Sequence, residues 1–191
     1  MENPKDYGFN SQLIHYSGHH DHYGSATVPI YQTSTFAFES AQDGADCFAG
    51  VKPGYMYTRI GNPTVKALER QVALLEHAYD SVAVASGMAA VSTVYLGLLN
   101  AGDHVVSSSA VYGASRVLME QHMSRFGVES TYVNTADLDA VKAAMRPNTK
   151  MLYVETPANP TMEISDIAAC AEIAHKNGAL LVVDNTFCSP Y

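Results

Sequence analysis

From about residue 63 onward, apolar and polar residues follow two alternating patterns along the chain. Stretches with apolar residues three and four positions apart predict helices, and short apolar runs between them predict buried strands. Asp137 and Ser165 are expected to cap two of the helices, and Gly178 is expected to end the last one. The predicted helices cover residues 64–79, 87–99, 113–126, 137–145 and 165–178, and the predicted strands cover 81–86, 103–109, 128–134, 149–156 and 179–185.

This alternation predicts the fold class. Strands that alternate with helices over short links are typical of an α/β protein whose mostly parallel sheet is covered by helices. In such sheets ligands bind at the carboxyl ends of the strands. The candidate chemistry is therefore sought where each predicted strand ends.

The first sixty residues have a different character. They show little periodicity and are rich in His, Tyr, Gly, Ser and Thr. A long irregular segment is unusual inside a compact domain. We therefore predict two regions: residues 1–60 as an extended arm that packs on a neighbouring subunit, and residues 61–191 as part of a ligand-binding domain.

Composition narrows the possible partners. The 191 residues carry a formal net charge of −8, which argues against a nucleic-acid partner. No apolar run is long enough to span a membrane, and the first residues lack the order of a signal peptide. The three cysteines are widely spaced and form no CxxC motif. The expected location is the cytoplasm, with no membrane partner.

Candidate ligand-binding residues occur in the turns that follow the strands predicted at 81–86 and 103–109. Ser86, Gly87 and Met88 open a helix, where free N–H groups suit a phosphate, although such a small-residue turn also serves tight packing. Tyr112 precedes Gly113, and its flat ring could stack on a planar ligand or simply fill the core.

The last two predicted strands end in polar residues as well. Asn159 is presented by a loop that Pro157 and Pro160 stiffen, so it is either a ligand contact or part of a rigid turn. Asp184 follows an apolar strand, where an unpaired carboxylate is costly. It should face a cation or a protonated nitrogen, with a helix cap as the alternative.

Three other kinds of site are disfavoured. A dinucleotide site needs three glycines after a strand, and the turn at 85–90 has one. A catalytic serine triad lacks its G-x-S-x-G turn. The histidines at 15, 19, 20 and 22 lie close together but in an irregular segment, so we expect a solvated arm and no metal site.

One ligand would use every strand-end feature. A phosphate at a helix start, a ring to stack on, an amide donor and an aspartate facing a ring nitrogen together describe pyridoxal 5′-phosphate (PLP). The sequence also resembles the Cys/Met-metabolism family of PLP-dependent enzymes, in the right order along the chain. The motifs that carry the resemblance are YTRIGNPT (57–64), ASGMAA (85–90), VYGAS (111–115), ETPANPT (155–161) and VVDNTFCSPY (182–191).

The resemblance implies fold type I, the aminotransferase-like architecture, and a homotetramer of tight dimers that share active sites. It implies roles for the candidate residues too. Ser86, Gly87 and Met88 would bind the cofactor phosphate, and Tyr57 with Arg59 would reach the phosphate of the neighbouring subunit. The ring-contacting residues implied are Tyr112 (stacking and proton transfer), Asn159 (the ring hydroxyl) and Asp184 (the ring nitrogen).

The same resemblance implies that a lysine forming a Schiff base with the cofactor follows the aspartate, whereas every lysine here precedes Asp184. The arginine that would grip the substrate carboxylate is also expected further along. We therefore expect this chain to be the front part of an enzyme about twice as long. The rival expectation is a non-catalytic fragment that acts in an oligomer or in regulation.

The expected activity is that of a carbon–sulfur lyase of the methionine γ-lyase type. It would act on a sulfur amino acid and release a thiol, a 2-oxo acid and ammonia. Ala114 stands where methionine γ-lyases carry Cys and the cystathionine enzymes and sulfhydrylases carry Gly. Cystathionine γ-lyase, cystathionine γ-synthase and O-acetylhomoserine sulfhydrylase activities, the last on a homoserine ester, thus stay open.

Overall fold

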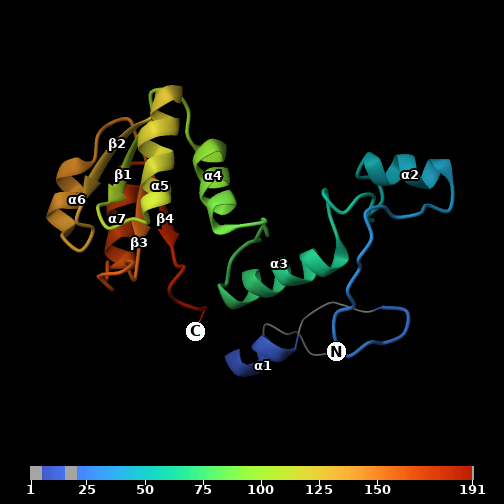
Figure 1. The fold of residues 1–191 in the computed structure, drawn as a ribbon. Helices are drawn as coiled ribbons and strands as arrows, with labels where there is room; N and C mark the ends of the chain where they lie inside the picture. Colours follow the sequence, from blue (N-terminus) through green and yellow to red (C-terminus); the bar gives the residue numbers. More distant parts are fainter. Residues whose placement is uncertain (1–5, 16–20, 191) are drawn as a thin grey trace. The chain divides into compact units, whose positions relative to one another are not determined.

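The computed structural model describes residues 6–15 and 21–190 (Figure 1). The chain forms two compact units, a first that ends at Ala83 and a second from Val84 to Ser189.

The second unit is built on a parallel four-stranded sheet, as the alternating pattern predicts. The strand order is β2-β1-β3-β4, and all three strand pairs are parallel. Val, Leu and Tyr make up half of the strand residues, which suits a sheet that is covered on both faces. The strands are β1 (His104–Ser108), β2 (Glu129–Val133), β3 (Thr149–Glu155) and β4 (Leu180–Asp184).

Helices connect these strands. The Asp137 side chain caps α6, accepting from the N–H groups of Asp139 and Ala140, as predicted. The prediction that Ser165 caps α7 is wrong: Asp166 accepts the N–H of Ala169, while Ser165 is buried and hydrogen-bonded to Thr135. The helices are α4 (Gly87–Leu98), α5 (Gly113–Val117), which continues as a π-helical turn (Leu118–His122) and a 3-10 turn (Met123–Phe126), α6 (Leu138–Ala144) and α7 (Ile167–Lys176).

Alternate residues of the strands supply two separate cores. On one face Val105, Met151 and Tyr153 pack with Tyr95 of α4 and with the helix that begins at α5. On the other face Val106, Leu152 and Val154 pack with α6 and α7, which lie together on that side in Figure 1. Side chains alternate between the two faces of a strand, so Glu155 shares the α4 and α5 face with Tyr153.

The first unit contains more regular structure than the irregular arm that we predicted. Two short helices form within it, because Ser40 caps the second through the Asp43 N–H and an apolar face is available. The predicted helix at 64–79 is present but ends at Leu75, and Asn62 caps it. The helices are α1 (Phe9–Ile14), α2 (Ala41–Phe48) and α3 (Pro63–Leu75).

The strand predicted at residues 81–86 does not form. An isolated strand leaves its backbone groups without hydrogen-bond partners, and no strand of the described residues pairs with this segment. Val82 is 78% exposed and Val84 is 41% exposed, so the apolar run that suggested a buried strand is not covered.

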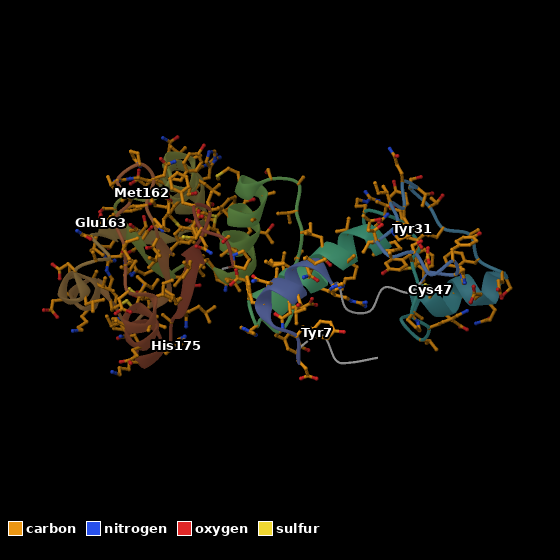
Figure 2. All side chains as sticks on the ribbon, turned by 90° about the horizontal axis from the view of Figure 1, so that it is seen from below. Tyr7, Tyr31, Cys47, Met162, Glu163 and His175 are labelled. Atoms are coloured by element: carbon orange, nitrogen blue, oxygen red, sulfur yellow. The ribbon has the colours of Figure 1, made fainter. Side chains whose placement is uncertain are left out.

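The side chains of both units are drawn in Figure 2, where Tyr31 and Cys47 mark the first unit and Met162 and Glu163 mark a loop of the second. Among the residues described, no helix combines the length and apolar character needed to cross a membrane.

Candidate functional site

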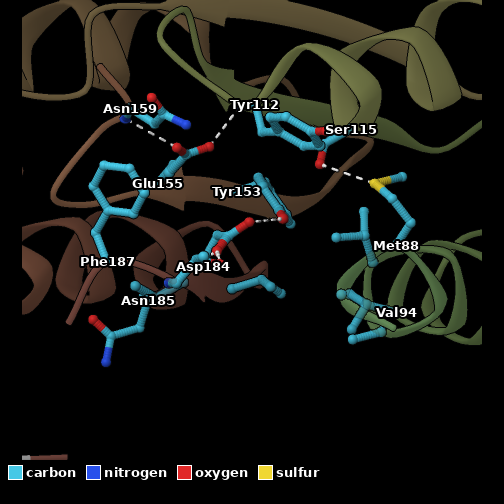
Figure 3. A pocket seen from close by; sticks show the side chains of 16 residues that line it. Met88, Val94, Tyr112, Ser115, Tyr153, Glu155, Asn159, Asp184, Asn185 and Phe187 are labelled. Atoms are coloured by element: carbon cyan, nitrogen blue, oxygen red, sulfur yellow. Dashed lines mark hydrogen bonds between the residues drawn. The ribbon is translucent and has the colours of Figure 1, made fainter. Parts of the chain in front are cut away.

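A pocket of about 350 Å³ opens at the carboxyl ends of β3 and β4 (Figure 3). This edge is where ligands bind in parallel sheets. All of its lining residues belong to the second unit. They include five of the predicted site residues, namely Gly87, Met88, Tyr112, Asn159 and Asp184.

The start of α4 supplies the hydrogen-bond donors. Ser86 is the N-cap, and its hydroxyl oxygen accepts the N–H of Ala89 at 3.1 Å. The N–H groups of Gly87 and Met88 donate to no acceptor among the described residues. A helix start with two open N–H groups attracts an anion, because the helix dipole adds partial positive charge there.

Asp184 ends β4 and presents its carboxylate to the pocket. One oxygen accepts the Tyr153 hydroxyl at 3.2 Å, and the other accepts the Thr186 N–H at 3.1 Å and its hydroxyl at 2.5 Å. A carboxylate offers about four acceptor positions, so one position is left for a ligand.

Tyr153 is buried beneath that carboxylate. Burial raises the pKa of the Tyr153 phenol well above its usual value, and nearby Tyr95 and Asp184 add to the shift. The phenol therefore stays protonated at neutral pH and acts as a hydrogen-bond donor to Asp184. The strand-end pattern pointed to Asp184 but gave no signal for Tyr153, which sits two residues inside an apolar strand.

Glu155 is the functional candidate that sequence reasoning missed. It ends β3, is only 5% exposed, and lies opposite Asp184 in the register of the two strands. Its two oxygens accept the Tyr112 N–H at 2.5 Å and the Asn159 N–H at 3.1 Å (Figure 3). The signal was available, because an acidic residue followed the apolar run at 151–154 just as Asp184 follows 180–183.

Aromatic rings and an amide complete the lining. Tyr112 precedes α5, and its ring is half exposed. Asn159 lies in the loop after β3, and Phe187 in the segment after β4 is also half exposed. Ser115 donates from its hydroxyl to the Met88 sulfur at 3.9 Å, which ties α5 to the start of α4.

The two remaining predicted residues, Tyr57 and Arg59, belong to the first unit. The Arg59 guanidinium lies 5.0 Å from the centre of the Tyr57 ring, and Arg59 forms no ion pair with the described residues. Buried Asn62 holds the loop nearby, since its amide donates to the Tyr31 carbonyl at 2.9 Å and to the Thr58 hydroxyl at 3.0 Å. His19 and His20 of the histidine-rich segment lie outside the described residues.

The pocket has a definite chemical character. Open N–H groups on one side attract an anion, a carboxylate on another side accepts from a protonated nitrogen, and Tyr112 and Phe187 offer aromatic faces. A flat ligand with an anionic group and a protonated ring nitrogen would use all three features.

Comparisons with known proteins agree with this character. Residues 10–191 match the model of the Cys/Met metabolism PLP-dependent enzyme family. The chain is 47% identical over 188 residues to L-methionine gamma-lyase of Fusobacterium nucleatum subsp. polymorphum, which is 98% of this chain and 48% of that enzyme. It is 47% identical over 161 residues to O-succinylhomoserine sulfhydrylase of Pseudomonas aeruginosa, which is 84% of this chain and 40% of that enzyme.

The crystal structure of cystathionine gamma-lyase from Lactobacillus plantarum complexed with L-serine is similar as well. It matches with a TM-score of 0.86 and 42% identity, over 97% of this chain and 46% of that one. The α/β fold with a parallel sheet is thereby confirmed and is consistent with fold type I. The chain spans about half the length of the curated relatives that it matches.

Proposed function

Because the chain belongs to the Cys/Met metabolism family of PLP-dependent enzymes, we propose that its pocket holds PLP and that the full-length protein is a carbon–sulfur lyase. The observation that carries the proposal is the shared pocket of the open Gly87 and Met88 N–H groups and the Asp184 carboxylate. These are the two groups that a phosphate and a protonated pyridine nitrogen need.

The size and the donors of the pocket support PLP. Its volume of about 350 Å³ lies in the range of small-ligand sites, about 300–1,000 Å³. The phosphate would accept from Gly87 and Met88, with Ser86 keeping the helix start in place through its cap to Ala89. Bound PLP supplies an electron sink, which makes it possible to break a carbon–sulfur bond of the substrate.

Asp184 would hold the ring nitrogen in its protonated form. Its carboxylate is oriented by Tyr153 and Thr186, so its free acceptor position has a fixed direction. An anion opposite a ring nitrogen favours the protonated state of that nitrogen. Keeping the ring nitrogen protonated therefore requires the negative charge of Asp184.

Tyr112 and Asn159 would contact the two other parts of the ring. The half-exposed Tyr112 ring would stack on the pyridine plane, and its hydroxyl would carry a proton during catalysis. The Asn159 amide would donate to the ring hydroxyl.

Tyr57 and Arg59 would complete the phosphate site of a neighbouring subunit. Arg59 has a free guanidinium fork within the described residues, and forks of this kind bind phosphate through paired hydrogen bonds. Residues 1–60 would then be the arm that reaches the neighbour, and residues 61–191 the front part of the PLP-binding domain. This arrangement requires a homo-oligomer, for which we propose a tetramer of tight dimers.

Methionine γ-elimination is our leading activity. The relatives also include an O-succinylhomoserine sulfhydrylase and a cystathionine gamma-lyase, so a sulfur amino acid or a homoserine ester is the substrate class. Ala114 lies two residues after Tyr112, the proposed proton carrier. A small apolar side chain there offers no thiol to the substrate.

The test is a substrate panel with the full-length protein and added PLP. Release of thiol and 2-oxo acid would be measured from methionine, cystathionine and cysteine, and thiol addition to O-acetylhomoserine would be measured in parallel. Methanethiol release from methionine is the expected result. Activity in the addition assay alone would make the protein a sulfhydrylase, and inactivity on the whole panel in the presence of PLP would overturn the lyase proposal.

A further inference from the structure

Glu155 joins two loops of the pocket that are far apart in sequence. One oxygen accepts the N–H of Tyr112, 43 residues earlier, and the other accepts the N–H of Asn159. Among the described residues, neither N–H has another acceptor. One carboxylate therefore determines where both loops begin to turn at the mouth of the pocket.

The contact needs a carboxylate in particular. Glu155 is 5% exposed and forms no ion pair with the described residues, so its charge is balanced by these N–H groups. A buried carboxylate without donors is costly, whereas hydrogen bonds to an ionised acceptor are roughly twice as strong as neutral ones. Each N–H is bonded to a different oxygen, so both oxygens are used.

The strand register places two acidic residues, Glu155 and Asp184, side by side, and their hydrogen-bond partners differ. Glu155 and Asp184 are partners on β3 and β4 and lie on the same face of the sheet. The Asp184 oxygens are bonded to Tyr153 and Thr186, and the Glu155 oxygens to backbone N–H groups. Asp184 is thus held by a phenol of β3 and by the segment after β4, whereas both oxygens of Glu155 are bonded to the backbones of the two loops.

We propose that Glu155 is a positioning residue that fixes the Tyr112 ring and the Asn159 amide at the pocket by holding both backbones. This inference rests on the proposed function, in which those two groups contact PLP. The Thr156 N–H donates to the Asp184 carbonyl of β4 at 3.2 Å, but further along the loop the other bonds are internal: the Ala158 N–H donates to the Glu163 carbonyl and the Met162 N–H to the Ala158 carbonyl. Figure 3 shows the carboxylate between the two loops.

The first experiment measures the two hydrogen bonds that Glu155 accepts, in the absence of PLP. Amide hydrogen exchange of Tyr112 and Asn159 is compared between the wild-type full-length protein, Glu155→Ala and the control Glu129→Gln. Glu129 is an exposed carboxylate at the opposite end of the sheet, paired with Arg146. We expect both amides to exchange about tenfold faster in Glu155→Ala alone, which is the loss expected for a hydrogen bond to a charged acceptor.

A second variant covers the case in which Glu155→Ala does not fold. Glu155→Gln keeps the volume but replaces one accepting oxygen with an NH₂ group, so one of the two amides should lose protection. Unchanged exchange at both amides in a folded variant overturns the proposal.

The second experiment tests whether the Glu155 hydrogen bonds affect PLP binding and catalysis. PLP affinity is measured by absorbance titration, together with kcat and KM, for the same variants. We expect the Kd for PLP to rise about tenfold in Glu155→Gln and to stay unchanged in Glu129→Gln. Faster exchange with unchanged Kd and kcat would overturn the positioning role, although the proposed function would stand. A wild-type protein that binds no PLP would overturn the proposed function and this role with it, whatever the exchange data show.

Discussion

The two units of the chain differ in the burial of their apolar side chains. The second unit buries apolar residues on both faces of its sheet, in two clusters that include its strands and four helical segments. In the first unit the buried apolar residues are few, namely Cys47, Ala67, Ala73 and Leu75. The exposed fractions on α3 are 40% for Val65, 57% for Leu68 and 37% for Val72.

This difference in burial suits the two units to different functions. A sheet with two covered faces can hold Asp184 and Glu155 in fixed register at its edge, which a catalytic pocket requires. A unit whose main helix leaves apolar residues uncovered has surface available for a partner. The pocket residues therefore belong to the second unit, and the exposed apolar residues of the first unit are consistent with the subunit contacts that we propose for it.

The largest expected effect follows from a single charge in the second unit. Asp184→Asn keeps the shape and most hydrogen bonds but removes the anion opposite the ring nitrogen. We expect kcat to fall about 10³-fold, the upper range for removing one preorganised electrostatic contact. Steady-state assays with methionine measure it. Asp139→Asn, at an exposed aspartate paired with Lys142, is the control and should keep wild-type activity. Full activity in Asp184→Asn would remove this residue from the site.

Tyr112→Phe should have the next largest effect. The ring keeps its stacking area, while the hydroxyl that would carry the proton is lost. We expect kcat to fall about 10²-fold, at the lower end of general acid–base contributions, with PLP affinity nearly unchanged. A variant with normal kcat but weak PLP binding would show that Tyr112 only stacks.

A change in the first unit should act across subunits. Arg59→Ala should raise the Kd for PLP about tenfold by removing a charge-assisted bond to phosphate. Co-expressed Arg59→Ala and Asp184→Asn subunits should recover part of the activity, because one kind of mixed site has both residues intact. No recovery in proven hetero-oligomers would place Arg59 and Asp184 of one chain in the same site and remove the shared-site proposal.

The sequence was most informative where each element carries its own physical signal. Strand runs at 103–109, 128–134, 149–156 and 179–185 are separated by helices, and all four form a parallel sheet. The run at 81–86 is also apolar, but no strand among the described residues pairs with it, and pairing is a property of the whole fold. Local pattern alone could not reveal that absence.

The site shows the same limit. Asp184, Tyr112, Asn159 and the turn at Gly87 were predictable because each follows a predicted strand, and the pocket brings them together. Glu155 and Tyr153 act through contacts with residues 31 or 43 positions away, which the strand register creates. The cap of α7 was misplaced by one residue because Ser165 and Asp166 are both good caps, and burial of Ser165 decided between them.

The smallest effect concerns pH and the core of the second unit. Burial lowers the pKa of His104, aided by the positive charge of Arg146, while Glu129 opposes the shift. Its ring is hydrogen-bonded to the Thr149 and Thr131 hydroxyls at 2.8 and 2.9 Å.

The unfolded chain therefore takes up a proton at higher pH than the folded chain, so stability should fall as pH drops below about 6.5. Urea midpoints at about pH 7.5 and about pH 5.5 measure the loss. In His104→Gln this acid dependence should be smaller. An unchanged dependence would mean that other groups cause it.

The most direct test of the account is a titration of the full-length protein with PLP, followed by visible absorbance and by mass. The account predicts one PLP bound per chain, a yellow protein, and weaker binding in Arg59→Ala than in wild type. A folded full-length protein that is colourless once unbound PLP has been removed, with the same spectrum in wild type and Asp184→Asn, would contradict the assignment of the pocket to this cofactor.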